Sequence, residues 1–293
     1  FSTNNGIMLP GYSQSTNMLG MNNQWLSPGL DFIAGGFQER DLLGNKSNFV
    51  YANHAYENNW LVDTSNFNYI STQYTVNHTE AMNFKASIKP INSLRIDLSA
   101  ERNLMENRSA NLGTDNGNFA LLNNQFNGSF STSIITWNTA FSADRLNDTT
   151  LSNQIWENLL EYRKMISSML SDANPNAPQS LESSGYYSGY DSTQQDVIIG
   201  AFLCAYKGQI PTVNNISPMG QKIPLPNWRV SFDGLTKIKF IKKHIKKLIF
   251  THAYRSNFSL GSYTTNLNGQ WDNQGNATQR DIAGNYISEK QIM

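Results

Sequence analysis

The fold of this chain is decided by two stretches, WRVSFD at residues 228–233 and FTHAYRSNFSLG at residues 250–261. Both alternate large apolar residues with small polar or charged ones at period two, although His252 and Ser256 interrupt the apolar phase of the second stretch. This alternation is typical of a β-strand that has one apolar face and one polar face. We therefore predict a strand at each stretch.

A lysine-rich segment, residues 237–248, connects the two predicted strands. Four apolar residues recur in it at spacings of three and four, so one face of a helical turn would be apolar and the rest basic: Ile238, Ile241, Ile245 and Leu248. We interpret residues 228–264 as strand, basic amphipathic turn and strand. The turn is either a solvated loop or a membrane-interface segment whose lysines meet phosphate headgroups. Because both neighbouring strands are candidate membrane strands, we favour the interface, with these residues in it: Trp228, Lys239, Lys242, Lys243, Lys246 and Lys247.

The composition favours strands in a membrane over a soluble domain or a disordered chain. Of the 293 residues only 15% are charged, which is few for a soluble domain, while 12% are aromatic, which is many for a disordered chain. Asn, Ser and Thr supply the remaining polarity, as expected where polar side chains face a water-filled pore and apolar ones face lipid. No apolar run approaches the roughly 20 residues that a membrane helix needs, so we expect any membrane span to be a strand.

Charge and chemistry disfavour several other classes of function. The 22 basic residues are balanced by 22 acidic ones, which argues against nucleic acid as the main partner. A single cysteine, Cys204, excludes an internal disulfide framework and a Cys-based zinc site, and in its apolar surroundings it is a small buried hydrophobe rather than a nucleophile. The four histidines lie far apart in the sequence and match no metal-ligand spacing. Asp97 and Glu101 could form a glycosidase dyad, but charges on the wet face of a strand explain them better. We therefore expect no enzymatic activity, metal or cofactor.

The clearest alternation in the chain lies at residues 94–101, directly after a turn at Pro90. Four apolar residues occupy one face and four polar residues the other, and a lipid-facing Arg or Lys near the bilayer midplane would cost about 2–4 kcal/mol. The predicted lipid-facing residues are Leu94, Ile96, Leu98, Phe250, Tyr254, Phe258 and Leu260. The predicted lumen-facing residues of the pore wall are Arg95, Asp97, Ser99, Glu101, Arg229, Ser231, Asp233, Arg255 and Asn257.

The predicted organisation has five parts. Residues 1–65 read as an irregular strap and loops, and residues 66–142 as transmembrane β-strands, with 129–142 strand-like through Thr, Ile and aromatic content. Residues 143–227 form a helical insertion between strands, with one helix at 150–170 and another starting near Ser192. The strand–turn–strand segment 228–264 follows, and 265–293 is a loop that leads into a further strand. Because the sequence begins at Phe1 without an initiator Met or signal peptide, we expect it to be part of a longer chain.

Several segments together resemble the SprA family, the giant outer-membrane gliding-motility proteins that form the translocon of the type IX secretion system in Bacteroidetes. The resemblance covers nearly the whole chain, as a late portion of a far longer one. Gly200 and Cys204 depart from the Pro and Ala that are more usual in that helix. The segments that carry the resemblance are Leu9-Pro10-Gly11-Tyr12, residues 25–32 (WLSPGLDF), residues 195–206 (QDVIIGAFLCAY), residues 225–230 (LPNWRV), Tyr254-Arg255-Ser256 and Gly261-Ser262-Tyr263.

The resemblance implies a segment of a very large antiparallel transmembrane β-barrel with a wide lumen. Folded cargo with a C-terminal secretion signal would cross it, and a PorV-type partner barrel and a periplasmic plug protein would close alternate exits. The implied location is the bacterial outer membrane, crossed many times, with periplasmic and surface-exposed parts. Two alternatives remain: a soluble surface-exposed β-rich adhesin or glycan-binding module, and a nutrient transporter barrel.

Overall fold

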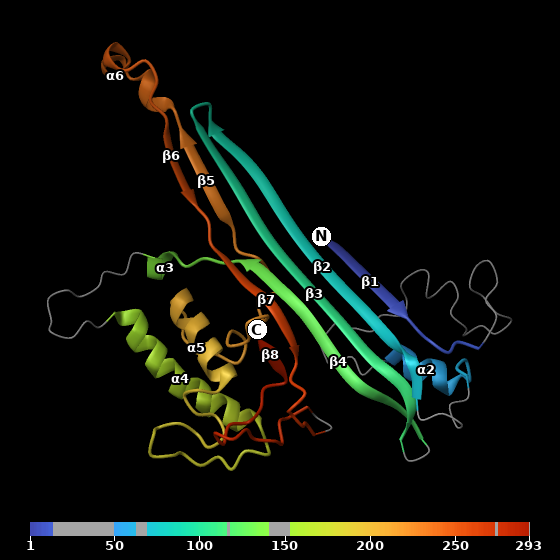
Figure 1. Cartoon of the computed structure of the whole chain (residues 1–293). Coiled ribbons are helices and arrows are strands. Elements are labelled where there is room, and N and C mark those ends of the chain that lie inside the picture. Colours follow the sequence, from blue (N-terminus) through green and yellow to red (C-terminus); the bar gives the residue numbers. More distant parts are fainter. Residues whose placement is uncertain (14–49, 63–68, 116–117, 141–152, 273–274, 293) are drawn as a thin grey trace. The chain divides into compact units, whose positions relative to one another are not determined.

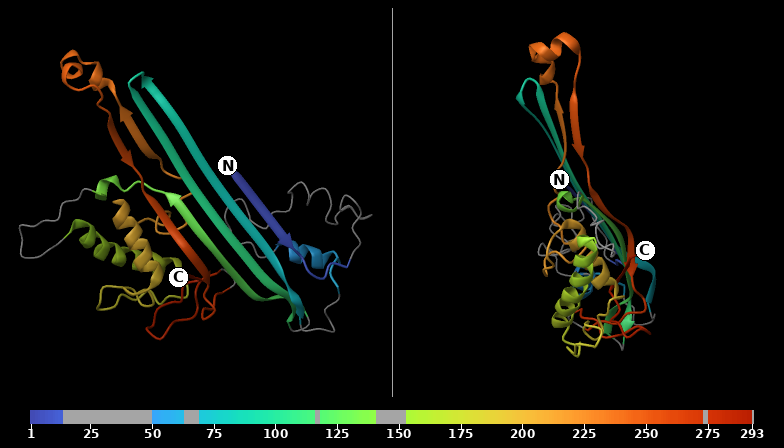
Figure 2. Two further views of the ribbon diagram at one scale, coloured as in Figure 1. Left: turned by 45° about the horizontal axis from the view of Figure 1, so that its top comes forward. Right: turned by 90° about the vertical axis from the view of Figure 1, so that its left-hand side faces the viewer.

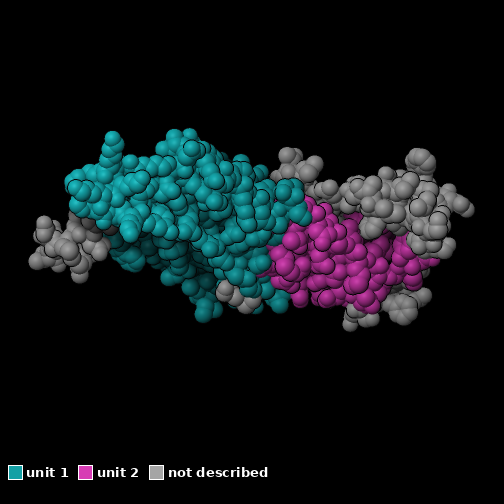
Figure 3. All heavy atoms as spheres, turned by 90° about the horizontal axis from the view of Figure 1, so that it is seen from above, with its two compact units in different colours: residues 1–2, 81–104, 129–293 teal, residues 3–80, 105–128 magenta. Residues whose placement is uncertain are grey.

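A computed structural model describes residues 1–13, 50–62, 69–115, 118–140, 153–272 and 275–292. The chain divides into two compact units, coloured separately in Figure 3. Unit 1 comprises residues 1–2, 81–104 and 129–293, and unit 2 comprises residues 3–80 and 105–128. The long strands contribute residues to both units, and each unit has its own buried core.

The secondary structure is dominated by an antiparallel sheet of eight strands (Figure 1), which confirms the prediction of a mainly β chain. The strands are β1 (Ser2–Met8), β2 (Tyr69–Ile91), β3 (Leu94–Asp115), β4 (Asn118–Ser133), β5 (Asn227–Phe232), β6 (Phe250–Tyr254), β7 (Asn257–Thr265) and β8 (Lys290–Ile292). Their order is β1-β2-β3-β4-β7-β8, and β5 pairs with β3 and β6. Within the described residues this sheet is open, because β1 and β8 do not pair with each other.

In unit 1, β4 and β5 lie end to end alongside β3. The register of β3 with β5 runs from Leu94 opposite Phe232 to Ser99 opposite Asn227. Two residues further along β3, the Glu101 N–H donates to the hydroxyl of Ser133, the last residue of β4, at 3.1 Å. The Ser133 carbonyl in turn accepts from the Leu225 N–H at 3.0 Å, just before β5 begins. One row of the sheet is therefore shared by two strands that are separated in sequence by a helical segment.

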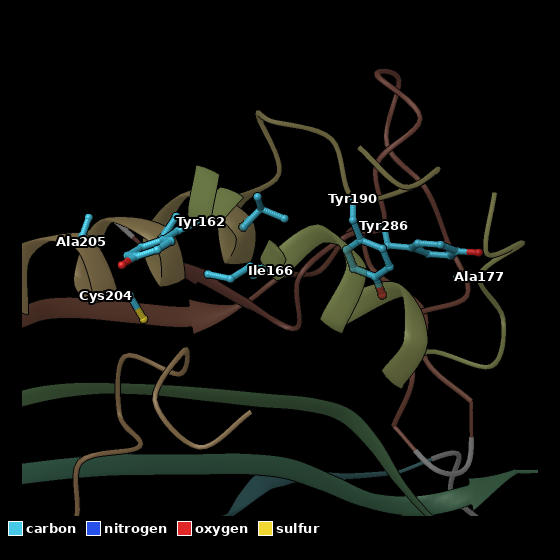
Figure 4. Close-up of a cluster of buried hydrophobic side chains, with 9 residues drawn as sticks. Tyr162, Ile166, Ala177, Tyr190, Cys204, Ala205 and Tyr286 are labelled. Carbon is cyan, nitrogen blue, oxygen red and sulfur yellow. The ribbon is translucent and has the colours of Figure 1, made fainter. Parts of the chain in front are cut away.

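This helical segment, described over residues 134–140 and 153–226, contains α3 (Trp137–Ala140), α4 (Gln154–Ala173) and α5 (Gln195–Lys207). Asn153 caps α4 through its side chain, Gln194 caps α5, and Gly208 ends α5 in the left-handed conformation with φ 66°. Figure 4 shows Tyr162 and Ile166 of α4 gathered with Cys204 and Ala205 of α5 in one apolar cluster. The helices pack closely at Gly200, where an added Cβ would lie 3.1 Å from the Ile166 Cδ1.

Three hairpins of one kind brace the end of this helical core. In each, an acidic residue exchanges backbone hydrogen bonds with residues three and four positions on, and a glycine with φ of 82° to 84° closes the turn. A residue in the left-handed conformation commonly closes such short hairpin connections. The three turns begin at Glu182, Asp272 and Asp281 and end at Gly185, Gly275 and Gly284. The Asp272 and Asp281 hairpins join the C-terminal residues to the helical segment, because Asn174 Nδ2 donates to the Ala277 carbonyl at 3.1 Å and the Tyr286 hydroxyl donates to the Asn176 carbonyl.

Unit 2 has a separate core that helix α2 (Val50–Glu57) shares with the sheet strands. Asn59 follows α2 with a left-handed φ of 57°, and the chain then delivers Trp60 into the core. His54 contacts the Trp60 ring edge-on at 5.3 Å. The buried residues of this core are Tyr51, Ala52, Ala55, Trp60, Tyr74, Val76, Ala110 and Leu112.

The structure corrects several boundaries predicted from the sequence. The segment predicted to be an irregular strap, residues 1–65, contains strand β1 and helix α2. Its residues 14–49 lie outside the part of the chain that the structure describes. The predicted strand-like segment 129–142 ends as a strand at Ser133, and Trp137 begins the short helix α3. The predicted lysine-rich helical turn is a 3-10 turn η1 (Gly234–Lys237) followed by the short helix α6 (Lys239–His244). No helix among the described residues is both long and apolar enough to cross a membrane.

Candidate membrane-facing surface

Five of the seven predicted lipid-facing residues lie side by side on one face of three paired strands. β3 pairs with β5 and β5 with β6, so their even-numbered residues fall into three rows across the sheet. The rows are Leu98–Trp228–Tyr254, Ile96–Val230–His252 and Leu94–Phe232–Phe250. We call these nine residues the apolar rows.

The apolar face continues onto β2. The Ser87 hydroxyl hydrogen-bonds the Asp97 carboxylate, so Ser87 lies on the polar face of the sheet. Because neighbouring residues of a strand point to opposite faces, Phe84 and Ile88 lie on the apolar face. Phe84, Ile88 and Phe250 are 55%, 48% and 57% exposed, respectively. Four strands thus present an apolar surface on which Phe84, Ile88 and Phe250 are exposed and the other eight residues of the apolar rows are half-buried.

An aromatic cluster marks one end of the apolar rows. Trp228 stacks on Tyr254 with ring centroids 4.4 Å apart. The ring centroid of Trp137 in α3 lies 5.7 Å from the centroid of each of these two rings. The Tyr254 hydroxyl accepts from the Thr136 N–H at 2.6 Å, which ties the start of the helical segment to β6. The Trp228 indole N–H donates to His252 Nδ1 at 3.4 Å, so His252 has a polar partner on an otherwise apolar face. Sequence reasoning missed Trp137 because it placed this residue in a strand.

Beyond the aromatic cluster the same face of the sheet is covered by protein. Arg102, on the apolar face of β3, donates from Nε to the Gln221 carbonyl at 3.0 Å and stacks over the Phe130 ring at 5.4 Å. Phe258, predicted to face lipid, lies half-buried against Phe130 with ring centroids 6.4 Å apart. Leu260 is only 6% exposed, so its predicted lipid contact is wrong. Figure 2 shows α4 and α5 on one side of the sheet.

The opposite face of the same strands is polar and open to water. Arg95 pairs with Asp97 within β3 at 2.9 Å, and Glu101 accepts from Asn257 Nδ2 at 2.8 Å while Arg255 lies 3.8 Å away. These pairs are largely exposed, so they add little stability and leave their charges accessible to solutes. The remaining predicted lumen residues, Ser99, Arg229, Ser231 and Asp233, are exposed or half-buried.

A groove of about 680 Å³ runs along this polar face. Its lining includes four cationic side chains and one carboxylate, from Lys85, Arg95, Arg229, Arg255 and Asp97. Cationic groups therefore outnumber carboxylates along the groove, although the register places Arg229 directly opposite Asp97.

Known protein families give no further guidance to the function of these surfaces. No protein-family model matches the sequence, and no curated protein matches it either.

The described residues contain no arrangement typical of a metal centre. Among them, no three His, Cys, Asp or Glu side chains lie close enough together to hold a metal ion. Cys204 is 1% exposed, its Sγ lies 3.5 Å from Asn215 Oδ1, and burial raises the pKa of its thiol. A buried thiol with a raised pKa is a poor nucleophile.

Proposed function

We propose that this chain is part of the wall of a transmembrane β-barrel in a bacterial outer membrane, with the apolar rows toward lipid and the polar groove toward a water-filled lumen. The observation that carries the proposal is the pairing of an uncovered apolar face with a charged, hydrated face on the same four strands. A soluble sheet normally buries its apolar face against another layer, as this one does from Arg102 onward. Uncovered apolar patches of this kind mark membrane or protein contacts.

The resemblance to the SprA family favours a protein-conducting channel that supports gliding motility. The wider polar face carries both signs, because Asp97 and Glu101 lie on it with Arg95 and Arg255. Such a face suits the task, since a lumen of one charge sign would retain cargo of the other. In this proposal the eight strands pair onward with the rest of a longer chain to close the barrel. The partners are then a PorV-type barrel, a periplasmic plug protein and folded cargo with a C-terminal signal.

Cysteine scanning of the full-length protein in its own cells tests which face meets lipid. Native Cys204 is buried, so it adds little background to labelling at introduced cysteines. Ser99→Cys reports the polar face, and Phe250→Cys reports the apolar rows at a residue of comparable exposure. We expect a membrane-impermeant maleimide to label Ser99→Cys, and a lipid-soluble maleimide to label Phe250→Cys.

The alternatives give different labelling patterns. A soluble adhesin or glycan-binding module would leave Phe250→Cys as reactive toward the impermeant reagent as Ser99→Cys, and this result would remove the membrane proposal. If the membrane pattern holds, bifunctional crosslinking from Ser99→Cys distinguishes a protein conduit from a nutrient transporter. Only a conduit would yield adducts with exported proteins.

A further inference from the structure

The tip of the β5–β6 hairpin, residues 234–249, combines positive charge with exposed apolar side chains. Six lysines occur in it and no acidic residue. Phe240 is 76% exposed, and Ile238 and Ile249 are about half exposed at 51% and 50%. Figure 1 shows α6 at the far end of the hairpin from the helical segment. We call residues 234–249 the basic tip.

The apolar rows are too short to cross a bilayer by themselves. From Trp228 to Phe232 the strand advances four residues, or about 13 Å at about 3.3 Å per residue. The apolar band of an outer-membrane barrel is about 25 Å tall, and strand tilt shortens the coverage further. The band must therefore continue past one end of the rows.

Only one direction is open for this continuation. At the aromatic end the face is covered, because the Arg102 guanidinium lies there against the Gln221 carbonyl. At the other end the rows lead through Phe232 and Phe250 directly into the basic tip. The exposed Ile238, Phe240 and Ile249 supply apolar surface where the strands end.

We infer that the basic tip is embedded in the membrane interface, with its apolar side chains among acyl chains and its lysines on anionic headgroup phosphates. Lysine stems can lie along apolar surface while the ammonium groups reach the headgroups. All lysines of the tip are exposed. Lys237 Nζ donates to the Ser93 hydroxyl, which fixes the tip against the β2–β3 turn. This inference rests on the proposed function, since it needs the apolar rows to face lipid.

The test uses the full-length protein in vesicles, with an environment-sensitive fluorophore on Phe240→Cys. Phe250→Cys is the matched reference in the apolar rows, and Ser99→Cys is the reference in water. We expect spin-labelled lipid to quench the label at positions 240 and 250, and iodide to quench it at position 99. Quenching by lipid at position 250 together with quenching by iodide at position 240 overturns the inference and leaves the proposed function standing. Iodide quenching at position 240 would instead favour binding of the basic tip to an acidic soluble partner. Iodide quenching at both positions overturns both ideas.

The lysine contribution is measured by comparing phosphatidylcholine vesicles with vesicles that also contain phosphatidylglycerol. Each lysine near an anionic surface strengthens binding about fivefold. We therefore expect lipid quenching at position 240 to rise when phosphatidylglycerol is added. Replacing Lys242, Lys243, Lys246 and Lys247 by Gln should strongly reduce this rise, with Lys237 and Lys239 remaining, but leave quenching at position 250 unchanged. An unchanged lipid dependence in the Gln variant would show that the lysines do not bind headgroups.

Discussion

The central prediction is that a charge at the middle of the apolar rows destabilises the chain in a membrane, while the same charge on the polar face does not. Val230 lies in the middle row, with Ile96 opposite it on β3 and His252 opposite it on β6. An arginine on the lipid face near the midplane costs about 2–4 kcal/mol. This corresponds to a loss of roughly 30-fold to 10³-fold in the equilibrium for insertion. Val230→Arg is therefore expected to shift the insertion equilibrium strongly.

Thr251→Arg is the control, because Thr251 lies opposite Ser231 on the exposed polar face of the same hairpin. A substitution at such a position usually changes stability by about 0.5 kcal/mol or less. The measurement is a urea titration of the full-length protein in phosphatidylcholine vesicles, read as the fraction protected from protease. In a soluble protein Val230 would be a half-covered surface residue that tolerates arginine. Equal urea midpoints for the two variants would therefore refute the facing of the sheet.

Three further predictions test other parts of the structure. Gly284→Ala should destabilise its hairpin by about 1–2 kcal/mol, because Gly284 has a left-handed φ of 84° that an alanine adopts only with strain. Gly261→Ala should cost much less, because Gly261 has equally open space around it but no left-handed φ. Hydrogen exchange at the Asn285 amide measures the destabilisation caused by Gly284→Ala. Cys204 should resist alkylation in the folded protein and react readily in denaturant. Because burial raises the pKa of its thiol, a shift from pH 7 to pH 8 should not bring the alkylation rate of the folded protein up to that of the denatured protein. Equal rates in the two states would contradict the burial of Cys204. Ile96→Arg should impair assembly of the full-length protein in the outer membrane while Arg95→Gln is tolerated, and heat-modified mobility on gels measures both; equal assembled yields would contradict the facing of β3.

The alternation of apolar and polar residues predicted strands best where one face is apolar and the other polar along the whole segment. At residues 94–99 and 228–232 one face is apolar and the other polar throughout, and the register of β3 with β5 unites the two patterns. The rule fails at Arg102, which breaks the apolar phase although β3 continues to Asp115. Its partners, the Gln221 carbonyl and the Phe130 ring, come from distant parts of the chain. No local pattern could have shown that this cation would be accommodated there.

Trp137 and Leu260 were misplaced for a related reason. Both are large apolar residues in strand-like surroundings, and the sequence alone cannot say whether lipid or protein covers them. For Trp137 the end-to-end placement of β4 and β5 decides its environment, because the chain leaves the sheet at Ser133 and returns at Asn227. The three hairpins, in contrast, carried a readable signal. Each has an acidic residue three positions before a glycine, and two of them are repeated at a spacing of nine residues.

Arg102 also limits where a bilayer could lie. Ala100 and Arg102 continue the apolar face of β3 past the rows, so a membrane extending in that direction would meet a guanidinium group. The protein instead covers this part of the sheet, giving the cation a carbonyl and an aromatic ring as partners. Three rows away, no such partner from the described residues covers the same face, and the face ends in exposed lysines. If the uncovered part faced water, nothing would require it to stay apolar between a covered cation at one end and a lysine cluster at the other. In the proposed arrangement a bilayer edge lies at the Trp228–Tyr254 pair, which accounts for the covered cation beyond it, since Trp and Tyr are the residues that favour this depth.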